Sequence, residues 1–429
     1  MLARVRREAV RHHMTFIRRP ATLHRSDFAH HTAGVARMNN GSFGASPLPV
    51  LESEAVHRMQ WRANPDAAYF GVGSDSLDAR IAAAGDAAAS SLGAPSGSVA
   101  LVENATVATA IIASRWAKAL RASPPGGGVL LLDICYGAVA YSVRDICEPA
   151  GGQLHFAKIP FPDTTAEAIL RALDETLQAT KPRFALLDHV SSQPAIVHPL
   201  IEMIDLCRAH GVEEVAVDGA HGVGLLEASS VDVTKMGADF YFTNLHKWAF
   251  APSTVTALHA TEAAMASTAH IVPSWHAGAG LLHESRWPGT RDFAAFLAVP
   301  EALEYLDQWR SAAGLGVQQY NADGFRTAAT ALGDAWGVAP AVADASVACV
   351  GMGMVRLPRS LDLSADVPGQ PSAGVRATLR DRYGIEAAVG GFGEHGGFLR
   401  LSHSVYTSDE DVERLRDAIS EMARAAQSG

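Results

Sequence analysis

Asp218 and Lys247 are the residues whose types and spacing favour one particular chemistry. Asp218 follows the apolar run 215–217, and Lys247 follows the apolar run 240–242 within Thr-Asn-Leu-His-Lys-Trp. A lysine can hold an aldehyde as a Schiff base, and a carboxylate can keep a pyridine nitrogen protonated so that the ring accepts electrons from a substrate carbanion. Because ligands in α/β sheets bind beyond the carboxyl ends of strands, we expect both side chains at the same rim of a sheet. The pair favours pyridoxal phosphate (PLP) as the cofactor.

Taken one at a time, these residues have simpler explanations. An aspartate at a strand end is most often a turn residue, and a lysine is most often a solvated surface charge. A second chemistry also remains open, in which Asp218 and His221 bind the metal of a hydrolase and Lys247 is structural. No His-Glu-x-x-His or Cys-x-x-Cys pattern accompanies them, so we expect no metal.

Short motifs spread along the chain carry a family resemblance. Asp-Gly-Ala-His and His-Lys-Trp resemble motifs of class V aminotransferase-like PLP enzymes of fold type I, especially the branch that contains isopenicillin-N epimerase and cysteine-conjugate C–S lyases. Further matches follow in the family's order, so that the resemblance covers roughly residues 38 to 420. The matching segments are 38–44, 103–106, 218–221, 243–248, 287–292 and 399–406.

Asn104, Ala105 and Thr106 stand between a predicted strand and a predicted helix. Backbone amides at a helix start and the Thr106 hydroxyl are free to hold an anion. The resemblance assigns this place to the cofactor phosphate. Without it, capping of the helix by Asn104 or Thr106 is the simpler explanation.

Other cofactor contacts are implied only by the resemblance. Asn244 and His246 occupy the positions of further phosphate ligands. Thr290 corresponds to a residue that reaches the phosphate of the neighbouring subunit, which implies a homodimer with a shared active site.

The cofactor ring has its own implied contacts. Tyr136 corresponds to the side chain that stacks on the ring, as an aromatic residue would by offset packing. Ser192 takes the place of an asparagine that bonds the phenolic oxygen in cysteine desulfurases, and His221 could share that role. Tyr136 could equally be an ordinary half-buried tyrosine.

Arg400 is the candidate for the substrate α-carboxylate, since a guanidinium can grip a carboxylate through two parallel hydrogen bonds. An isolated arginine in a strand is usually a surface residue. The Arg-x-Ser-x-x-x-Tyr frame of Arg400, Ser402 and Tyr406 matches the family and favours the substrate role. Asn40, in the first matching segment, is assigned to the substrate as well.

The expected reaction starts when Lys247 removes the α-proton of an amino acid. Related desulfurases need a nucleophilic cysteine about fifteen residues before the carboxylate arginine, but no cysteine lies between Cys349 and Arg400, where the glycine-rich segment 390–397 suggests an open loop. We therefore expect β-elimination from a cysteine S-conjugate, in bacterial secondary metabolism such as antibiotic biosynthesis. Epimerisation of an isopenicillin-N type of amino acid and decarboxylating oxidative deamination of a conjugate remain alternatives.

The composition bounds the class of protein. A chain of 429 residues, 48% apolar and 19% charged, can bury a large core and is long enough for two domains. A formal charge of −10 argues against nucleic-acid binding, and no apolar run is long enough to span a membrane. The four cysteines are scattered, which favours a reduced, cytoplasmic setting.

The hydrophobic pattern predicts an α/β fold of PLP fold type I. Apolar runs that alternate with helical stretches predict a mostly parallel sheet flanked by helices, followed by a smaller α+β C-terminal domain. We expect an arginine-rich N-terminal arm over 1–50, a large PLP-binding domain over 51–300 and a small domain over 301–429. The predicted strands are 99–102, 129–132, 184–187, 215–217, 240–242, 255–258, 347–357 and 398–401. The predicted helices are 107–120, 165–177, 200–210, 301–308 and 408–425.

Overall fold

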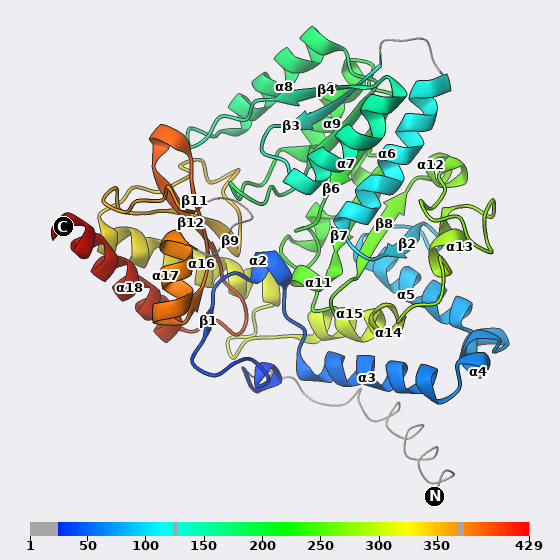
Figure 1. Cartoon of the computed structure of the whole chain (residues 1–429), viewed down its shortest axis with the longest axis horizontal. Helices are drawn as coiled ribbons and strands as arrows, with labels where there is room; N and C mark the ends of the chain where they lie inside the picture. The colour runs from blue at the N-terminus through cyan, green and yellow to red at the C-terminus, as the bar shows by residue number, and fades with distance from the viewer. Residues whose placement is uncertain (1–24, 123–126, 367–372, 429) are drawn as a thin grey trace, which may run out of the picture.

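The computed structural model describes residues 25–122, 127–366 and 373–428. Figure 1 shows a large sheet with helices on its faces, and beside it a smaller group of C-terminal elements coloured yellow to red. The arginines of the predicted N-terminal arm precede residue 25, so that prediction lies outside the described residues.

The seven-stranded central sheet has the order β2-β8-β7-β6-β5-β3-β4. In this sheet β8 alone runs opposite to the other strands, so the predicted mostly parallel sheet is confirmed. The strand β4 was not predicted, because it lies at the sheet edge and several of its side chains are exposed, which removes the apolar run. The strands are β2 Val99–Val102, β3 Gly128–Leu132, β4 Gln153–Ala157, β5 Phe184–Asp188, β6 Glu214–Asp218, β7 Phe240–Asn244 and β8 Thr256–Ala260.

Alternate residues of the buried strands pack on opposite faces of this sheet, as the period of two along a strand requires. One face packs against α6 (Ala105–Ala122) and α7 (Gly137–Cys147). The other face packs against α5 (Leu77–Ser91), α8 (Ala166–Thr180) and α9 (Leu200–Ala209). Helices on both faces bury the sheet and leave its edges and strand ends for function.

The C-terminal group has its own hydrophobic cluster between a three-stranded antiparallel sheet and three helices. The predicted strand at 398–401 and the final helix are present as β12 and α18, whereas α16 and α17 were not predicted. The predicted domain boundaries at residues 50 and 300 remain a prediction. The elements are α16 Val317–Trp336, β9 Met352–Arg356, α17 Gly374–Tyr383, β11 Ala388–Gly391, β12 Gly397–Ser402 and α18 Asp409–Ser428.

The glycine-rich segment 390–397 is more ordered than the open loop that its composition suggests. Gly390 and Gly391 belong to β11, and a 3-10 turn follows at Gly393–His395. The Phe392 ring packs against Phe161 and Phe398 at centroid distances of 4.8 and 5.3 Å. These aromatic contacts tie the segment to the sheet.

A short N-terminal segment joins the two parts of the structure. The helix α2 (Asn40–Phe43) packs on α11 (Leu245–Trp248), which carries Lys247 (Figure 1). Gly44 ends α2 with φ of 70°, and a Cβ at this position would lie 1.8 Å from the His246 carbonyl oxygen. Only glycine permits this close approach of the two backbones.

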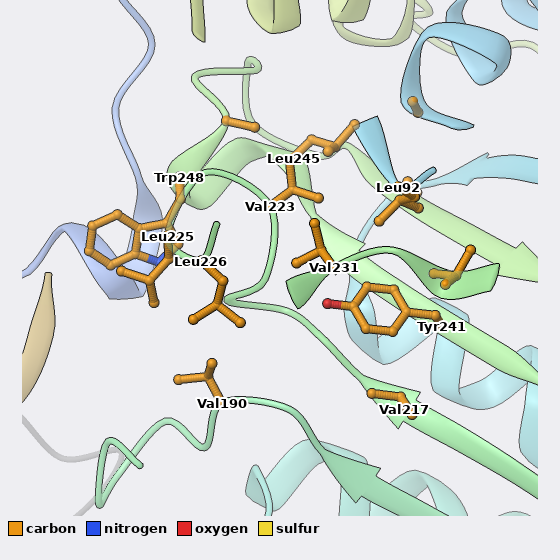
Figure 2. Close-up of a cluster of buried hydrophobic side chains, with 14 of the residues drawn as sticks. Leu92, Val190, Val217, Val223, Leu225, Leu226, Val231, Tyr241, Leu245 and Trp248 are labelled. Atoms are coloured by element: carbon orange, nitrogen blue, oxygen red, sulfur yellow. The ribbon is translucent and has the colours of Figure 1, made fainter. Parts of the chain in front are cut away.

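Beneath α11 lies a cluster of buried apolar side chains that includes Val223, Leu225, Tyr241 and Trp248 (Figure 2). Trp248 is 2% exposed, so its indole ring is fixed inside this cluster. The packing holds the turn that carries Lys247 against the end of the sheet.

Within the described ranges, no helix is both long enough and apolar enough to cross a membrane.

Candidate active site

A cavity of about 470 Å³ opens at the carboxyl ends of the parallel strands. The side chains predicted to bind the cofactor converge on it from separate segments of the chain, with one exception discussed below. Loops at the ends of parallel strands meet at one rim, which is why residues so distant in sequence come together. The predicted residues that line it are Asn104, Ala105, Thr106, Tyr136, Ser192, Asp218, His221, Asn244, His246 and Lys247.

Lys247 and His221 form the centre of the cavity. The Trp248 indole N–H donates to Nδ1 of His221 over 3.1 Å, and Nε2 of the same ring lies 3.2 Å from Nζ of Lys247. Burial, together with the positive charge of Lys247, holds the pKa of His221 well below its ordinary value, so the ring is neutral. A neutral ring that accepts at Nδ1 carries its proton at Nε2, from which it donates to the unprotonated form of the Lys247 amine.

The amine of Lys247 has a lowered pKa, so it loses its proton more easily than an ordinary lysine. Burial lowers its pKa to about 8, although the charge of Asp218 opposes the change. A lysine with a pKa in this range is partly neutral near physiological pH, and only the neutral amine is a nucleophile or a base.

Asp218 ends β6 inside the cavity. Its Oδ1 accepts a hydrogen bond from the Ala220 amide over 2.9 Å, and its side chain is 4% exposed. Burial raises the pKa of this carboxyl, while the Ala220 amide and Lys247 act in the opposite direction. A cation held beside Asp218 would therefore stabilise the ionised form.

Asp188 is a second buried acid, which the sequence reasoning did not select. It ends β5 and pairs directly with Asp218 across the sheet. Burial and the nearby charge of Asp218 raise its pKa well above the ordinary value, and its Oδ2 atom has no hydrogen-bond partner. Asp188 is thus the member of the pair whose ionised form is disfavoured more strongly. The signal that selected Asp218, an acid directly after an apolar strand, is also present at Asp188.

The turn before α6 offers donors to an anion. Thr106 lines the cavity at the start of the helix. The Asn104 side chain accepts from the Val107 amide over 3.0 Å, so the capping role considered from the sequence is present. The backbone amide of Ala105 is also occupied, because it donates to the side-chain oxygen of Asn244 over 3.0 Å. Thr106 is the residue of this turn that is best placed to meet a phosphate.

Asn244 and His246 lie opposite that turn. The carbonyl oxygen of Asn244 accepts from Ala105 and from the Thr256 hydroxyl, which leaves its NH₂ group to donate into the cavity. His246 places Nδ1 3.0 Å from the Val255 carbonyl oxygen, and burial lowers its pKa to about 4. A bound anion would favour the protonated ring, since opposite charges stabilise each other in a buried site.

Arg400 lies on β12 and is 3% exposed. Nη1 donates to the Ser192 hydroxyl at 2.7 Å, and Nη2 donates to Asn39 at 2.8 Å and to the Ser42 hydroxyl at 2.6 Å. Its Nε atom is buried without a partner. Arg400 itself is not among the residues that line the cavity, whereas Ser42 and Ser192, to which it donates, are. The Ser42 hydroxyl donates to Asn39, so the Ser192 hydroxyl is the one left to join the free Nε–H of Arg400 at a substrate carboxylate.

Asn40 is turned toward the protein. Its NH₂ group donates to the Lys247 carbonyl oxygen over 3.1 Å, and its own oxygen accepts from the Tyr406 hydroxyl over 2.7 Å. Ser402 accepts from the Gly41 amide over 3.3 Å. The Arg-x-Ser-x-x-x-Tyr frame therefore fixes the 39–42 segment against the lysine turn, and the substrate contact assigned to Asn40 remains a prediction.

Two predicted residues are exposed on this single chain. Tyr136 precedes α7, lines the cavity and is 56% exposed. Thr290 is exposed and does not line the cavity. Both observations leave room for another molecule beside the cavity, and the roles assigned to these residues remain predictions.

The alternative of a metal site finds no ligand set. In the described part of the chain, no group of three or more His, Cys, Asp or Glu side chains is arranged to hold a metal ion. The four cysteines are free, and none of them lines the cavity.

Comparisons with known proteins fit this geometry. Residues 44–415 match the family described as aminotransferase class-V. The chain is 34% identical to a probable chloroplastic L-cysteine desulfhydrase of Arabidopsis thaliana, over 95% of this chain and 89% of the relative. It is 28% identical to isopenicillin N epimerase of Streptomyces clavuligerus, over 90% and 94% of the two chains. A solved structure of a C-DES mutant with glycine linked to the PLP cofactor shares the fold, with a TM-score of 0.73 at 18% identity over 94% of this chain and 99% of that chain.

Proposed function

Because the chain belongs to the class-V aminotransferase family, we propose that it is a PLP-dependent C–S lyase that acts on cysteine or on an S-substituted cysteine. The family match confirms the resemblance predicted from the sequence motifs. The observation that carries the proposal is the neutral His221 beside the weakly basic Lys247, in a cavity that holds Asp218 and no cysteine.

The residues present fit PLP, the cofactor of this family. Asp218 is a buried carboxyl that a protonated pyridine nitrogen would stabilise, and Lys247 is the amine for the aldehyde. Thr106, Asn244 and His246 would hold the phosphate. When bound, PLP supplies an electron-accepting ring that stabilises negative charge on the substrate α-carbon.

The protein's own groups perform the remaining tasks. Arg400 would hold the α-carboxylate and so fix the α-carbon near Lys247. Nζ of Lys247, unprotonated in part because its pKa is about 8, would take the α-proton, while Nε2–H of His221 keeps that nitrogen oriented.

Elimination then breaks the bond between the β-carbon and sulfur. The sulfur leaves with a proton as a thiol, or as hydrogen sulfide from free cysteine. The three-carbon fragment takes up one water and ends as pyruvate and ammonia, so the reaction consumes no oxidant or reductant. Transfer of sulfur to a protein cysteine is not supported, because no cysteine faces the cavity.

Incubation with cysteine and a series of S-substituted cysteines tests the reaction. Pyruvate and free thiol in equal amounts are expected. Return of the conjugate with an inverted α-carbon would indicate an epimerase, and release of carbon dioxide with an aldehyde would indicate oxidative decarboxylation. Borohydride reduction followed by peptide mass analysis should place the cofactor label on Lys247, and a label elsewhere would refute the site.

A homodimer with a shared site is part of this proposal. It is supported by the exposure of Thr290 outside the cavity of its own chain. Mixed Lys247→Ala and Thr290→Ala proteins should regain activity in hybrid dimers, since one site then has both residues intact. No recovery despite proven subunit exchange would contradict the shared site.

A further inference from the structure

Arg376 is a cationic side chain of the cavity that the steps above do not use. It lies in the first turn of α17, in the C-terminal group coloured orange in Figure 1, and reaches the same cavity as Lys247. Its Nε atom is buried and has no hydrogen-bond partner. Among the described residues, no carboxylate pairs with its guanidinium.

The acid that contacts the backbone of Arg376 is already occupied. The carboxylate of Asp366 accepts from the backbone amides of Val375 and Arg376, each over 2.9 Å. Asp366 therefore caps the start of α17, as acidic residues commonly do, and is 8% exposed. The side chain of Arg376 is left facing the cavity without a counter-charge.

A substrate with one carboxylate leaves one cationic side chain of the cavity without a partner. With PLP bound, Asp218 would be matched by the pyridine nitrogen, Lys247 would hold the aldehyde, and the phosphate would lie against Thr106, Asn244 and His246. Arg400 is matched by the α-carboxylate. Arg376 is then the remaining cation, and it lies close enough to Arg400 that its charge, after burial, helps to lower the pKa of Arg400 to about 10. Arg376 thus has a buried donor at the cavity without a partner among the described residues, and an anionic group of the substrate would satisfy it.

We propose that Arg376 forms an anion subsite for the sulfur substituent, so that the preferred substrate is a cysteine S-conjugate whose substituent ends in a carboxylate. This inference rests on the proposed lyase function and adds its substrate class. The α-carboxylate binds Arg400 and the distal carboxylate binds Arg376, with the scissile bond between them. A conjugate with an uncharged end leaves the buried Nε–H of Arg376 unsatisfied.

Two nearly isosteric conjugates isolate the charge. S-carboxymethyl-L-cysteine should exceed its amide, S-carbamoylmethyl-L-cysteine, in kcat/KM by about tenfold to a hundredfold, the size expected of a charge-assisted hydrogen bond. Arg376→Gln should bring the ratio close to one. Arg376→Glu should invert the preference in favour of S-(2-aminoethyl)-L-cysteine. A purely structural role would lower turnover of all conjugates together and leave the ratio unchanged.

Arg380→Gln is the matched control. Arg380 lies one turn further along α17, pairs with Glu386 at 3.0 Å and does not line the cavity. Its substitution removes the same charge from the same helix and should keep the wild-type ratio. An equal change in both variants would mean that the general field of α17, and not a contact of Arg376, sets the preference, and would overturn the subsite.

Binding separates this inference from the lyase reaction. L-glutamate and L-glutamine lack a leaving group, and calorimetric titration of the holoenzyme measures their affinity without turnover. Glutamate should bind more tightly to the wild type, and Arg376→Gln should remove the difference. If no conjugate yields pyruvate yet glutamate is preferred, the lyase assignment fails and the subsite stands. If pyruvate forms without preference for carboxylates, and glutamate and glutamine bind alike, the subsite is wrong.

Discussion

Replacement of Trp248 by phenylalanine tests how the fold sets the proton position at the active site. The indole N–H is the donor that keeps Nδ1 of His221 unprotonated and so places the ring proton on Nε2, toward Lys247. Phenylalanine fills most of the same space but donates nothing. The proton of His221 can then move to Nδ1, and the ring presents a lone pair to the lysine nitrogen.

The size of the effect follows from one neutral hydrogen bond. Donation from Nε2–H stabilises the unprotonated lysine nitrogen by about 0.5 to 1.5 kcal/mol, and one pKa unit corresponds to about 1.36 kcal/mol. Loss of the donor should therefore raise the pKa of this nitrogen by about half a unit to one unit. The direction is the same whether the lysine nitrogen is free or bound to the cofactor, because the donor favours the unprotonated form in both cases.

The assay is a pH titration of the absorbance of the holoenzyme, whose colour reports the protonation of the lysine nitrogen. Trp116→Phe is the control, because Trp116 is also fully buried and donates its indole N–H to Glu214 over 2.9 Å, on the face of the sheet that α6 covers. Both variants should lose stability, and only Trp248→Phe should move the titration upward. A midpoint that stays in place or moves down, with cofactor still bound, would refute the proton assignment.

Three further outcomes follow from the same groups. Lys247→Met should stabilise the cofactor-free protein at pH 7 by up to about 3 kcal/mol, because a fall in the pKa of Lys247 from 10.5 to about 8 means that folding disfavours the charged amine. This gain in stability should be full below pH 8 and should vanish as the pH rises toward 10.5. Equal melting temperatures of the two proteins at pH 7 would contradict it. Asp218→Asn should lower turnover strongly whereas Asp188→Asn should not, since the raised pKa of Asp188 favours the neutral acid, which asparagine mimics. Equal losses in kcat would contradict this difference between the two acids. Arg400→Lys should lower kcat/KM by about tenfold to a hundredfold, because a point charge cannot make two parallel hydrogen bonds, and an unchanged value would remove Arg400 from the substrate site.

The sequence by itself determined the sheet and the ends of its strands. Buried strands form apolar runs in the sequence, so the strand that ends at Asp218 and the strand that precedes Lys247 could be located, and with them the rim where a ligand binds. The same rule fails at a sheet edge, where only the last residue of β4 is buried and the strand shows no apolar run. Local motifs thus predicted the cofactor, because the groups that would hold it lie within a few residues of strand ends.

Only the tertiary structure decided which partners those groups have. The hydrogen bond from Trp248 to His221 spans 27 residues, and the anchors of Arg400 on Asn39 and Ser192 lie 361 and 208 residues away along the chain. Such contacts leave no periodic signal in a sequence, since they depend on how separate elements pack. The proton on His221, the raised pKa of Asp188 and the unpartnered Nε of Arg376 all follow from that packing, because burial and nearby charges, not residue type, set the state of an ionisable group.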